Sequence, residues 1–179
     1  MTRLAFIFDT ETSGLIDNHS IPLDEQPEII EFYGTTVDLD SGEVHNELDL
    51  LIKPRRPVPA EITRITGLTD EDLKGAPPFA DVAMSVRTAL EGAPRVIAHN
   101  LSFDQEMVDT EYERLGQTIT WPRRICTVEQ TLHRSGFRLS LTALHELLFQ
   151  ETFPSAHRAK ADVMALVRVC VELRRLGDL

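Results

Sequence analysis

The stretch from Leu4 to Gly14 constrains the fold most, because an apolar run passes directly into two carboxylates. Residues 4–8 are rich in aromatic and branched side chains and apolar on both alternating faces, which predicts a β-strand buried on both sides. Because side chains alternate along a strand, Asp9 and Glu11 share one face, with Cα atoms about 7 Å apart. Two like charges there are costly unless a cation lies between them. The stretch is therefore either part of a divalent cation site or an ordinary polar turn.

Length and composition predict one globular domain that spans residues 1–179. The chain is 42% hydrophobic and 26% charged, which is enough for a core of ordinary size. Two cysteines far apart in sequence, Cys126 and Cys170, favour reduced thiols packed in the core of a cytoplasmic protein over a disulfide scaffold. No apolar run approaches the length of a membrane span, and residues 4–8 are too short for the core of a signal peptide.

The charge balance restricts how the chain can bind anions. The formal net charge is −11, from 18 basic and 29 acidic side chains, which argues against coating nucleic acid by bulk attraction. The distribution is uneven: residues 1–60 carry 4 basic and 12 acidic side chains, whereas residues 120–179 carry 9 basic and 6 acidic. An anionic ligand is therefore expected to contact mainly the basic residues of the C-terminal third.

Strand and helix signals follow one another in an order typical of an α/β domain with a mixed sheet. Strand-like runs cover residues 29–39, 44–52 and 96–98, and the first two are joined by a hairpin signal, so the first three strands form a meander. Residues 53–59 and 116–124 are expected to be loops. A short helix is expected to start at Thr69, and Ser102 and Gln105 fit a capping box. Helical periodicity predicts longer helices over residues 79–91, 102–115, 127–134, 139–149 and 159–176.

Two further carboxylates point toward apolar faces. Asp104 aligns with core-type residues of its helix, although an Asp at a helix start often only satisfies the helix dipole. Asp162 heads an apolar stripe on the last helix and requires a partner, which is either a cation or an arginine from another element. His157, on the turn before that helix, is either a general base or an ordinary exposed histidine.

Three segments together resemble the DEDD exonuclease family in its histidine subtype, to which proofreading subunits of bacterial replicative polymerases, ribonuclease T and oligoribonuclease belong. The matching segments are residues 8–15 (FDTETSGL), 99–104 (HNLSFD) and 157–162 (HRAKAD). The resemblance implies a ribonuclease-H-like fold, which is a five-stranded mixed sheet flanked by helices. It also implies cleavage of nucleotides from a free 3′ end.

Hydrolysis of a phosphodiester suits four carboxylates that hold two divalent cations. We assign Asp9 as the bridging ligand, Glu11 and Asp162 to the ion that binds the attacking water, and Asp104 to the second ion. His157 takes the proton from the water. Mg²⁺ or Mn²⁺ is expected because the ligand set is all oxygen.

Substrate contacts are expected mainly at two places. Residues 65–67 (ITG) resemble the family's contact with the terminal nucleotide, and Phe103 either stacks on a base or belongs to the core. His99 is expected mainly to shape its loop. The candidate substrate-binding residues are Thr10, Thr12, Ile65, Thr66, His99, Asn100 and Phe103.

The sequence thus predicts a metal-dependent 3′-5′ exonuclease that acts on single-stranded DNA or mismatched primer ends in replication or proofreading. The expected partner is the 3′ end of single-stranded DNA or RNA, with a polymerase subunit as a second partner and no membrane. One alternative is an exoribonuclease that trims RNA. Another is a non-catalytic nucleic-acid-binding module of the same fold. A structural protein with an acidic surface would not need inward carboxylates.

Overall fold

The computed structural model describes residues 3–16, 20–153 and 157–179, and every candidate site residue falls within these ranges. The described residues form one five-stranded sheet in the order β3-β2-β1-β4-β5. β1 pairs antiparallel with β2 and parallel with β4, and β2 pairs antiparallel with β3. The predicted meander and mixed sheet are therefore confirmed. The strands are β1 (Leu4–Thr12), β2 (Ile29–Asp38), β3 (Val44–Leu51), β4 (Arg95–Ala98) and β5 (Arg123–Cys126).

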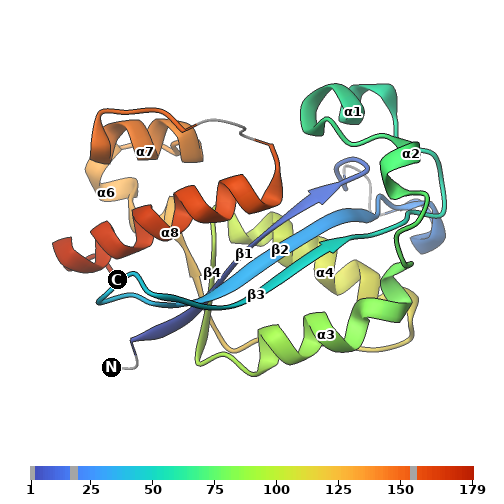
Figure 1. Ribbon diagram of the computed structural model, residues 1–179, viewed down its shortest axis with the longest axis horizontal. Coiled ribbons are helices and arrows are strands. Elements are labelled where there is room, and N and C mark those ends of the chain that lie inside the picture. Colours follow the sequence, from blue (N-terminus) through green and yellow to red (C-terminus); the bar gives the residue numbers. More distant parts are fainter. Residues whose placement is uncertain (1–2, 17–19, 154–156) are drawn as a thin grey trace.

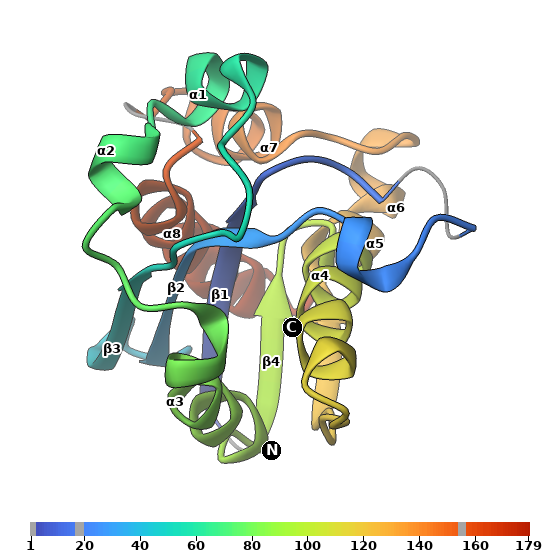
Figure 2. The ribbon, with the colours of Figure 1, turned by 90° about the vertical axis from the view of Figure 1, so that its right-hand side faces the viewer.

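Helices cover both faces of the sheet (Figures 1 and 2). One hydrophobic core lies between the sheet and α3 and α4, and a second lies between the sheet and α7 and α8. No helix among the described residues is long and apolar enough to cross a membrane. The helices are α1 (Ala60–Thr66), α2 (Asp70–Leu73), α3 (Phe79–Glu91), α4 (Leu101–Arg114), α5 (Thr127–Gln130), α6 (Leu132–Ser135), α7 (Leu141–Phe149) and α8 (Ala159–Leu176), with a 3₁₀ turn at Leu23–Glu25.

β1 supplies both cores, because its side chains alternate between the two faces. Phe6 and Phe8 belong to the core under α3 and α4, whereas Ala5 and Ile7 belong to the core under α8. The ring of Phe6 also lies over Gly34 of β2, where an added Cβ would stand 2.3 Å from Phe6 Cζ. This close approach explains why β2 carries a glycine at that position.

The strand continues beyond the predicted residues 4–8 as far as Thr12, so the two carboxylates lie within β1 and not after it. Alternation then places Asp9 and Glu11 on the same face as Ile7, toward α8. It places Thr10 on the opposite face, toward α4. Alternation along this one strand therefore decides which helix each site residue faces.

Three local predictions were wrong. Residues 123–124 were expected in a loop, but they begin β5, which pairs with β4 along Ile97 and Ile125. The capping box at Ser102 is absent: α4 starts one residue earlier, after Asn100 in the left-handed conformation (φ 65°), so Ser102 lies inside the first turn. The helix over residues 127–134 is interrupted at Thr131, whose hydroxyl donates back to the carbonyl oxygen of Thr127 at 2.8 Å.

Other local predictions were confirmed. α3 has the predicted bounds, and α2 begins after Thr69, whose side chain and that of Asp72 cap each other's backbone N–H groups. The helix α1, which the sequence did not predict, ends at Gly67 with φ 75°. Both cysteines are free and buried.

Candidate active site

Three carboxylates from two distant elements meet beside the C-terminal part of β1. Asp9 and Glu11 come from β1, and Asp162 comes from the first turns of α8, which crosses the same face of the sheet (Figure 1). One carboxylate oxygen of each lies within 4.8 Å of the others. The helix supplies Asp162 from the same stripe that carries the buried Leu166, so packing of that stripe brings the carboxylate to the strand.

Asp104 reaches β1 from the opposite face. It lies in the first turn of α4 and is only 2% exposed. Its Oδ1 accepts hydrogen bonds from the backbone nitrogen of Thr10 at 3.0 Å and from the Thr10 hydroxyl at 2.8 Å. The fourth predicted carboxylate is thus joined to the residue between Asp9 and Glu11.

Burial raises the pKa of each of the four predicted carboxylates, and repulsion from neighbouring carboxylates adds to this rise at Asp9, Glu11 and Asp162. Burial lifts the pKa of Asp9 well above its usual range, and the charges of Asp104 and Glu11 raise it further. Burial, followed by the charges of Asp162 and Glu31, raises the pKa of Glu11 to about 8. Burial raises the pKa of Asp104 to about 7 against the lowering effect of the Thr10 hydrogen bonds.

The pKa of Asp162 is also raised by burial, and the backbone hydrogen bond from His157 opposes that rise. A set of oxygen donors that repel one another in a buried position fits a divalent cation, whose charge would replace the protons that repulsion otherwise retains. The donor set therefore fits a divalent cation held by oxygen ligands.

Glu31 is a fifth carboxylate at this site, and sequence reasoning missed it. It stands on β2 opposite Glu11 in the strand register and is 2% exposed. Its charge raises the pKa of Glu11, and its oxygens accept hydrogen bonds from Arg158 and from the backbone nitrogen of Ala159. The available signal was a single acidic residue inside the apolar run 29–33.

His157 lies at the rim of the cluster. Its backbone nitrogen donates to Asp162 Oδ2 at 2.8 Å, and the residue is exposed. Its φ of 71° is unusual for a residue other than glycine, so the backbone there is held in place by its surroundings. The structure brings His157 next to a candidate metal ligand, and its role as general base stays a prediction.

A hollow of about 390 Å³ opens next to Glu11. It is bounded by the end of β1, by α1 and by the first turn of α4. Five of the seven candidate substrate contacts line it: Thr10, Thr12, Ile65, Thr66 and Phe103. The structure thus collects these residues around one space beside the carboxylates, and their contact with substrate stays a prediction.

His99 and Asn100 do not line this hollow. The two ring nitrogens of His99 lie 2.9 Å from the Thr127 hydroxyl and 3.0 Å from the carbonyl oxygen of Leu139. Asn100 Oδ1 accepts a hydrogen bond from Arg138 at 2.6 Å. Both residues therefore tie the loop before α4 to the segment before α7, which is the loop-shaping role expected for His99, and their contact with substrate stays a prediction.

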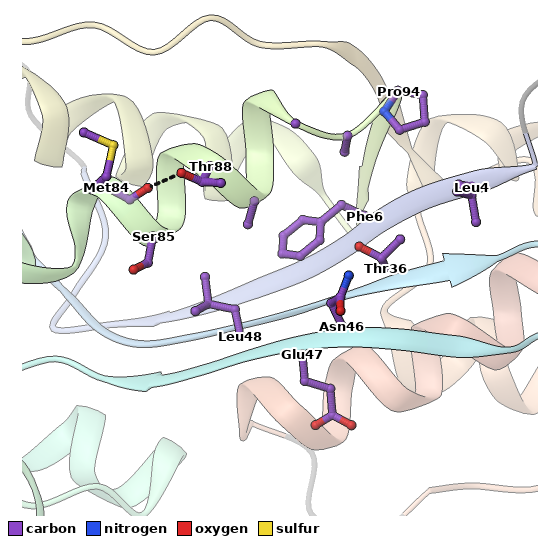
Figure 3. Close-up of a pocket in the computed structure, with 13 residues that line it drawn as sticks. Leu4, Phe6, Thr36, Asn46, Glu47, Leu48, Met84, Ser85, Thr88 and Pro94 are labelled. Atoms are coloured by element: carbon purple, nitrogen blue, oxygen red, sulfur yellow. Dashed lines mark hydrogen bonds between the residues drawn. The ribbon is translucent and has the colours of Figure 1, made fainter.

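A larger hollow of about 610 Å³ lies between α3 and the sheet (Figure 3). Figure 3 shows Phe6 and Leu48 facing it, whereas the carboxylate of Glu47 lies on the other side of β3. The hollow borders Leu4, at the end of β1 opposite to the acidic cluster. Size alone therefore does not identify the site, because Glu11 of the acidic cluster lines the smaller hollow and not the larger one.

The fold and the acidic cluster define a ribonuclease-H-like domain with a candidate metal site at the end of its central strand. Residues 6–170 match a protein family described as "Exonuclease". Since the match covers most of the 179 residues, the chain belongs to this exonuclease family. The family resemblance stated from the three sequence motifs and the prediction of an exonuclease are thereby confirmed.

Two curated relatives are proteins of bacterial DNA replication by name. The chain is 36% identical over 110 residues to "DNA polymerase III PolC-type" of Listeria innocua serovar 6a, an alignment that covers 62% of this chain and 7% of the relative. It is 34% identical over 147 residues to "DNA polymerase III subunit epsilon" of Pasteurella multocida, covering 79% of this chain and 56% of that subunit. The matches thus span only part of each relative.

Solved structures share the fold. Exonuclease X in complex with 5′ overhanging duplex DNA superimposes with a TM-score of 0.72 at 24% identity, over 98% of this chain and 93% of that one. The nuclease domain of 3′hExo, a DEDDh family member bound to rAMP, gives a TM-score of 0.79 at 16% identity, over 98% and 94%. These likenesses confirm the predicted ribonuclease-H-like fold.

Proposed function

We propose that residues 1–179 form a single domain that removes nucleoside monophosphates from the 3′ end of single-stranded DNA or of a mismatched primer, in the cytoplasm. The observation that carries this proposal is the convergence of Asp9, Glu11, Asp104 and Asp162 beside the hollow that Thr66 borders. Such a space next to acidic ligands suits a terminal nucleotide whose phosphate faces the cluster.

The four carboxylates would hold two divalent cations, Mg²⁺ or Mn²⁺, because the donor set is all oxygen. When bound, the cations supply an activated water and stabilise the leaving oxygen of the phosphodiester. Thr10 keeps Asp104 in place through its two hydrogen bonds. In the bound state all four carboxylates are ionised despite their raised pKa values.

His157 would accept the proton of the attacking water. An imidazole changes its charge close to neutral pH and can both accept and release a proton during one turnover. The residue is exposed at the rim beside Asp162, so solvent can reach it. The bond from its backbone nitrogen to Asp162 fixes the residue without using the ring.

The hollow beside Glu11 would bind the terminal nucleotide. Phe103 and Ile65 offer apolar surface for a base, and Ile65 is 43% exposed. Thr66 closes the inner wall with its hydroxyl already donating to the carbonyl oxygen of Ile62. The net charge of −11 does not prevent binding of a phosphate backbone, because cations bound at the carboxylates would neutralise the charge locally.

DNA is the favoured substrate because the two curated relatives are named as DNA polymerase III proteins. If this kinship extends to function, a polymerase subunit is the expected partner and proofreading the expected role. RNA trimming is the second candidate, since the nuclease domain of 3′hExo, which shares this fold, is bound to the ribonucleotide rAMP.

The test uses single-stranded DNA and RNA of one sequence, labelled at either end, with Mn²⁺, Mg²⁺ or EDTA. We expect 5′-labelled DNA to shorten stepwise and 3′-labelled DNA to release labelled mononucleotide from the first turnover, with no cleavage in EDTA. Asp9→Asn serves as the inactive control, because it keeps the shape of the side chain and removes its charge. Cleavage from the 5′ end, or cleavage unaffected by EDTA, would contradict the proposal.

A further inference from the structure

We propose that the Glu31–Arg158 pair positions the active site by fixing the start of α8, so that Asp162 and His157 meet Asp9 and Glu11. This inference rests on the proposed function, but the geometry that supports it does not. Glu31 and Arg158 are separated by 127 residues in sequence and join β2 to the residue that precedes α8. Glu31 was not among the candidates from sequence, and Arg158 was expected only as a basic side chain that could contact the nucleic-acid backbone.

The contacts between the two residues are numerous. Arg158 Nη2 donates to Glu31 Oε1 at 2.8 Å, and Arg158 Nε lies 3.2–3.3 Å from both carboxylate oxygens. The Glu31 side chain is 3% exposed, whereas that of Arg158 is 45% exposed. A buried carboxylate thus holds one side of a guanidinium whose other side faces water.

The same carboxylate caps the helix. Arg158 is the residue before α8, and its own side chain makes no capping hydrogen bond. Instead, Glu31 Oε2 accepts a hydrogen bond from the backbone nitrogen of Ala159 at 3.0 Å, which is one of the first-turn N–H groups that a helix leaves without an internal partner. A negative charge at this end also interacts favourably with the helix dipole.

From this anchored turn, the remaining contacts lead to the reacting groups. The backbone nitrogen of Asp162 donates to the carbonyl oxygen of Arg158 at 3.0 Å, which closes the first turn. Asp162 Oδ2 then accepts from the backbone nitrogen of His157 at 2.8 Å. A shift of the first turn of α8 would therefore move Asp162 and His157 together relative to β1.

Glu31 acts by positioning and not as a ligand. Both of its oxygens are engaged by Arg158 and by the backbone nitrogen of Ala159, which leaves neither of them free for the group that Asp9, Glu11 and Asp162 form. Its position opposite Glu11 in the register nevertheless places it directly beside that group.

The sharpest test compares Glu31→Gln, which removes a negative charge, with Arg158→Gln, which removes a positive charge. Binding of Mn²⁺ alone to each variant is measured by calorimetric titration. If the pair positions Asp162, both changes weaken Mn²⁺ binding by about tenfold, the size expected when support around a metal ligand is lost. If the pair acts only through its charge, loss of the acid weakens binding and loss of the arginine strengthens it. Opposite signs, or no change in either variant, would overturn the inference.

A matched control is available on the neighbouring strand. Glu47 of β3 also reaches the first turn of α8, through an ion pair with Lys160 at 3.0 Å, but it is 45% exposed and accepts no hydrogen bond from the backbone of α8. Glu47→Gln should leave Mn²⁺ affinity within about twofold of the unmodified protein, as expected for an exposed ion pair. An equal loss in Glu47→Gln and Glu31→Gln would remove any special role for Glu31.

Activity provides an independent readout. With labelled DNA, Glu31→Gln is expected to lower kcat by about tenfold and to leave KM unchanged, because the nucleotide hollow at Thr66 and Phe103 is not touched. A protein that does not cleave DNA at all would contradict the proposed function, while the Mn²⁺ titrations would still decide the role of the pair.

Discussion

Asp104 and Asp162 bring the same chemical group to the same cluster, but the chain holds them in different ways. Asp104 is 2% exposed and is bonded directly to the central strand through two hydrogen bonds from Thr10. Asp162 is half-buried at the start of α8 and accepts a hydrogen bond from the backbone nitrogen of His157. Glu31 on β2 does not contact Asp162 but binds the backbone of Ala159 in the same helix turn. Both residues lie in the first turn of a helix, but Asp104 is bonded directly to the central strand, whereas Asp162 depends on a helix start that a second strand anchors.

This difference separates the contribution of a site residue to folding stability from its contribution to the reaction rate. Hydrogen bonds to a buried charge contribute strongly to folding stability, because leaving that charge without partners is costly. Contacts at an exposed rim contribute little to stability but can decide the rate. We therefore expect changes on the Asp104 side to lower stability first, and changes on the His157 side to lower the rate first.

The largest effect on rate is expected for His157→Ala. Loss of a general base lowers kcat by about 10²–10⁴-fold. Because the residue is exposed, the free energy of unfolding should change by less than about 0.5 kcal/mol, and Mn²⁺ affinity should stay within about twofold. Single-turnover cleavage of labelled DNA, a thermal melt and a calorimetric titration with Mn²⁺ measure the three quantities. Normal cleavage by this variant between pH 6 and 8, which is about the range in which histidine titrates, would contradict the assignment.

The largest effect on stability is expected for Thr10→Val, which removes the hydroxyl that donates to Asp104 and keeps the backbone hydrogen bond. A hydrogen bond to a charged group contributes about 1.5–3 kcal/mol, so the free energy of unfolding should fall by about that amount at pH 8. The rate should fall by only about tenfold, the low end of the loss expected when support around a metal ligand is reduced, because the backbone hydrogen bond still holds the carboxylate. Urea unfolding and cleavage assays give both values.

Thr35→Val is the matched control for that prediction. Thr35 is also buried in the sheet, and its hydroxyl donates to a neutral acceptor, the carbonyl oxygen of Asn46, at 2.8 Å. Its loss should cost only about 1 kcal/mol. If Thr10→Val instead leaves stability unchanged and slows cleavage as much as His157→Ala, the contrast between the two sides of the cluster is wrong.

A smaller effect is expected from pH in the absence of metal. The pKa of Glu11 is raised from 4.5 to about 8, and that of Asp104 to about 7, so the folded protein holds protons that the unfolded chain has released at neutral pH. The resulting stability is complete below the unfolded pKa values and is lost as the pH rises through 7 and 8. The Tm in EDTA should therefore fall by several degrees between pH 6 and pH 9.

Two further measurements sharpen that prediction. Glu11→Gln cannot titrate, so it should flatten the decline of Tm with pH. Added Mn²⁺ should raise the Tm most at pH 9, because there the ligands are already free of protons. A Tm that rises between pH 6 and pH 9 in EDTA would show that these carboxylates are not protonated in the folded protein.

The sequence predicted the site through its motifs, because each motif combines a periodic core pattern with an acidic side chain on the buried face. The stripe that carries Leu166 predicted the inward direction of Asp162, and alternation along β1 predicted that Asp9 and Glu11 share a face. Such patterns depend only on the local period of a helix or strand.

What escaped sequence reasoning depends on contacts between distant segments. β5 is four residues long and is defined by its pairing with β4, so residues 123–124 look like loop on their own. The role of Glu31 depends on Arg158, 127 residues away. The start of α4 was misplaced because the left-handed conformation of Asn100, and not a side-chain cap, begins that helix.

The central claim is that acidic side chains from three distant segments form one divalent cation site. The most direct measurement is a calorimetric titration with Mn²⁺ of the unmodified protein and of Asp9→Asn, Asp104→Asn and Asp162→Asn. The control is Glu172→Gln, because Glu172 pairs with Arg175 near the other end of α8. We predict saturable binding that each of the three Asp variants weakens by at least about tenfold and the control leaves unchanged. Binding by Asp104→Asn or Asp162→Asn with the affinity of the unmodified protein would contradict the claim.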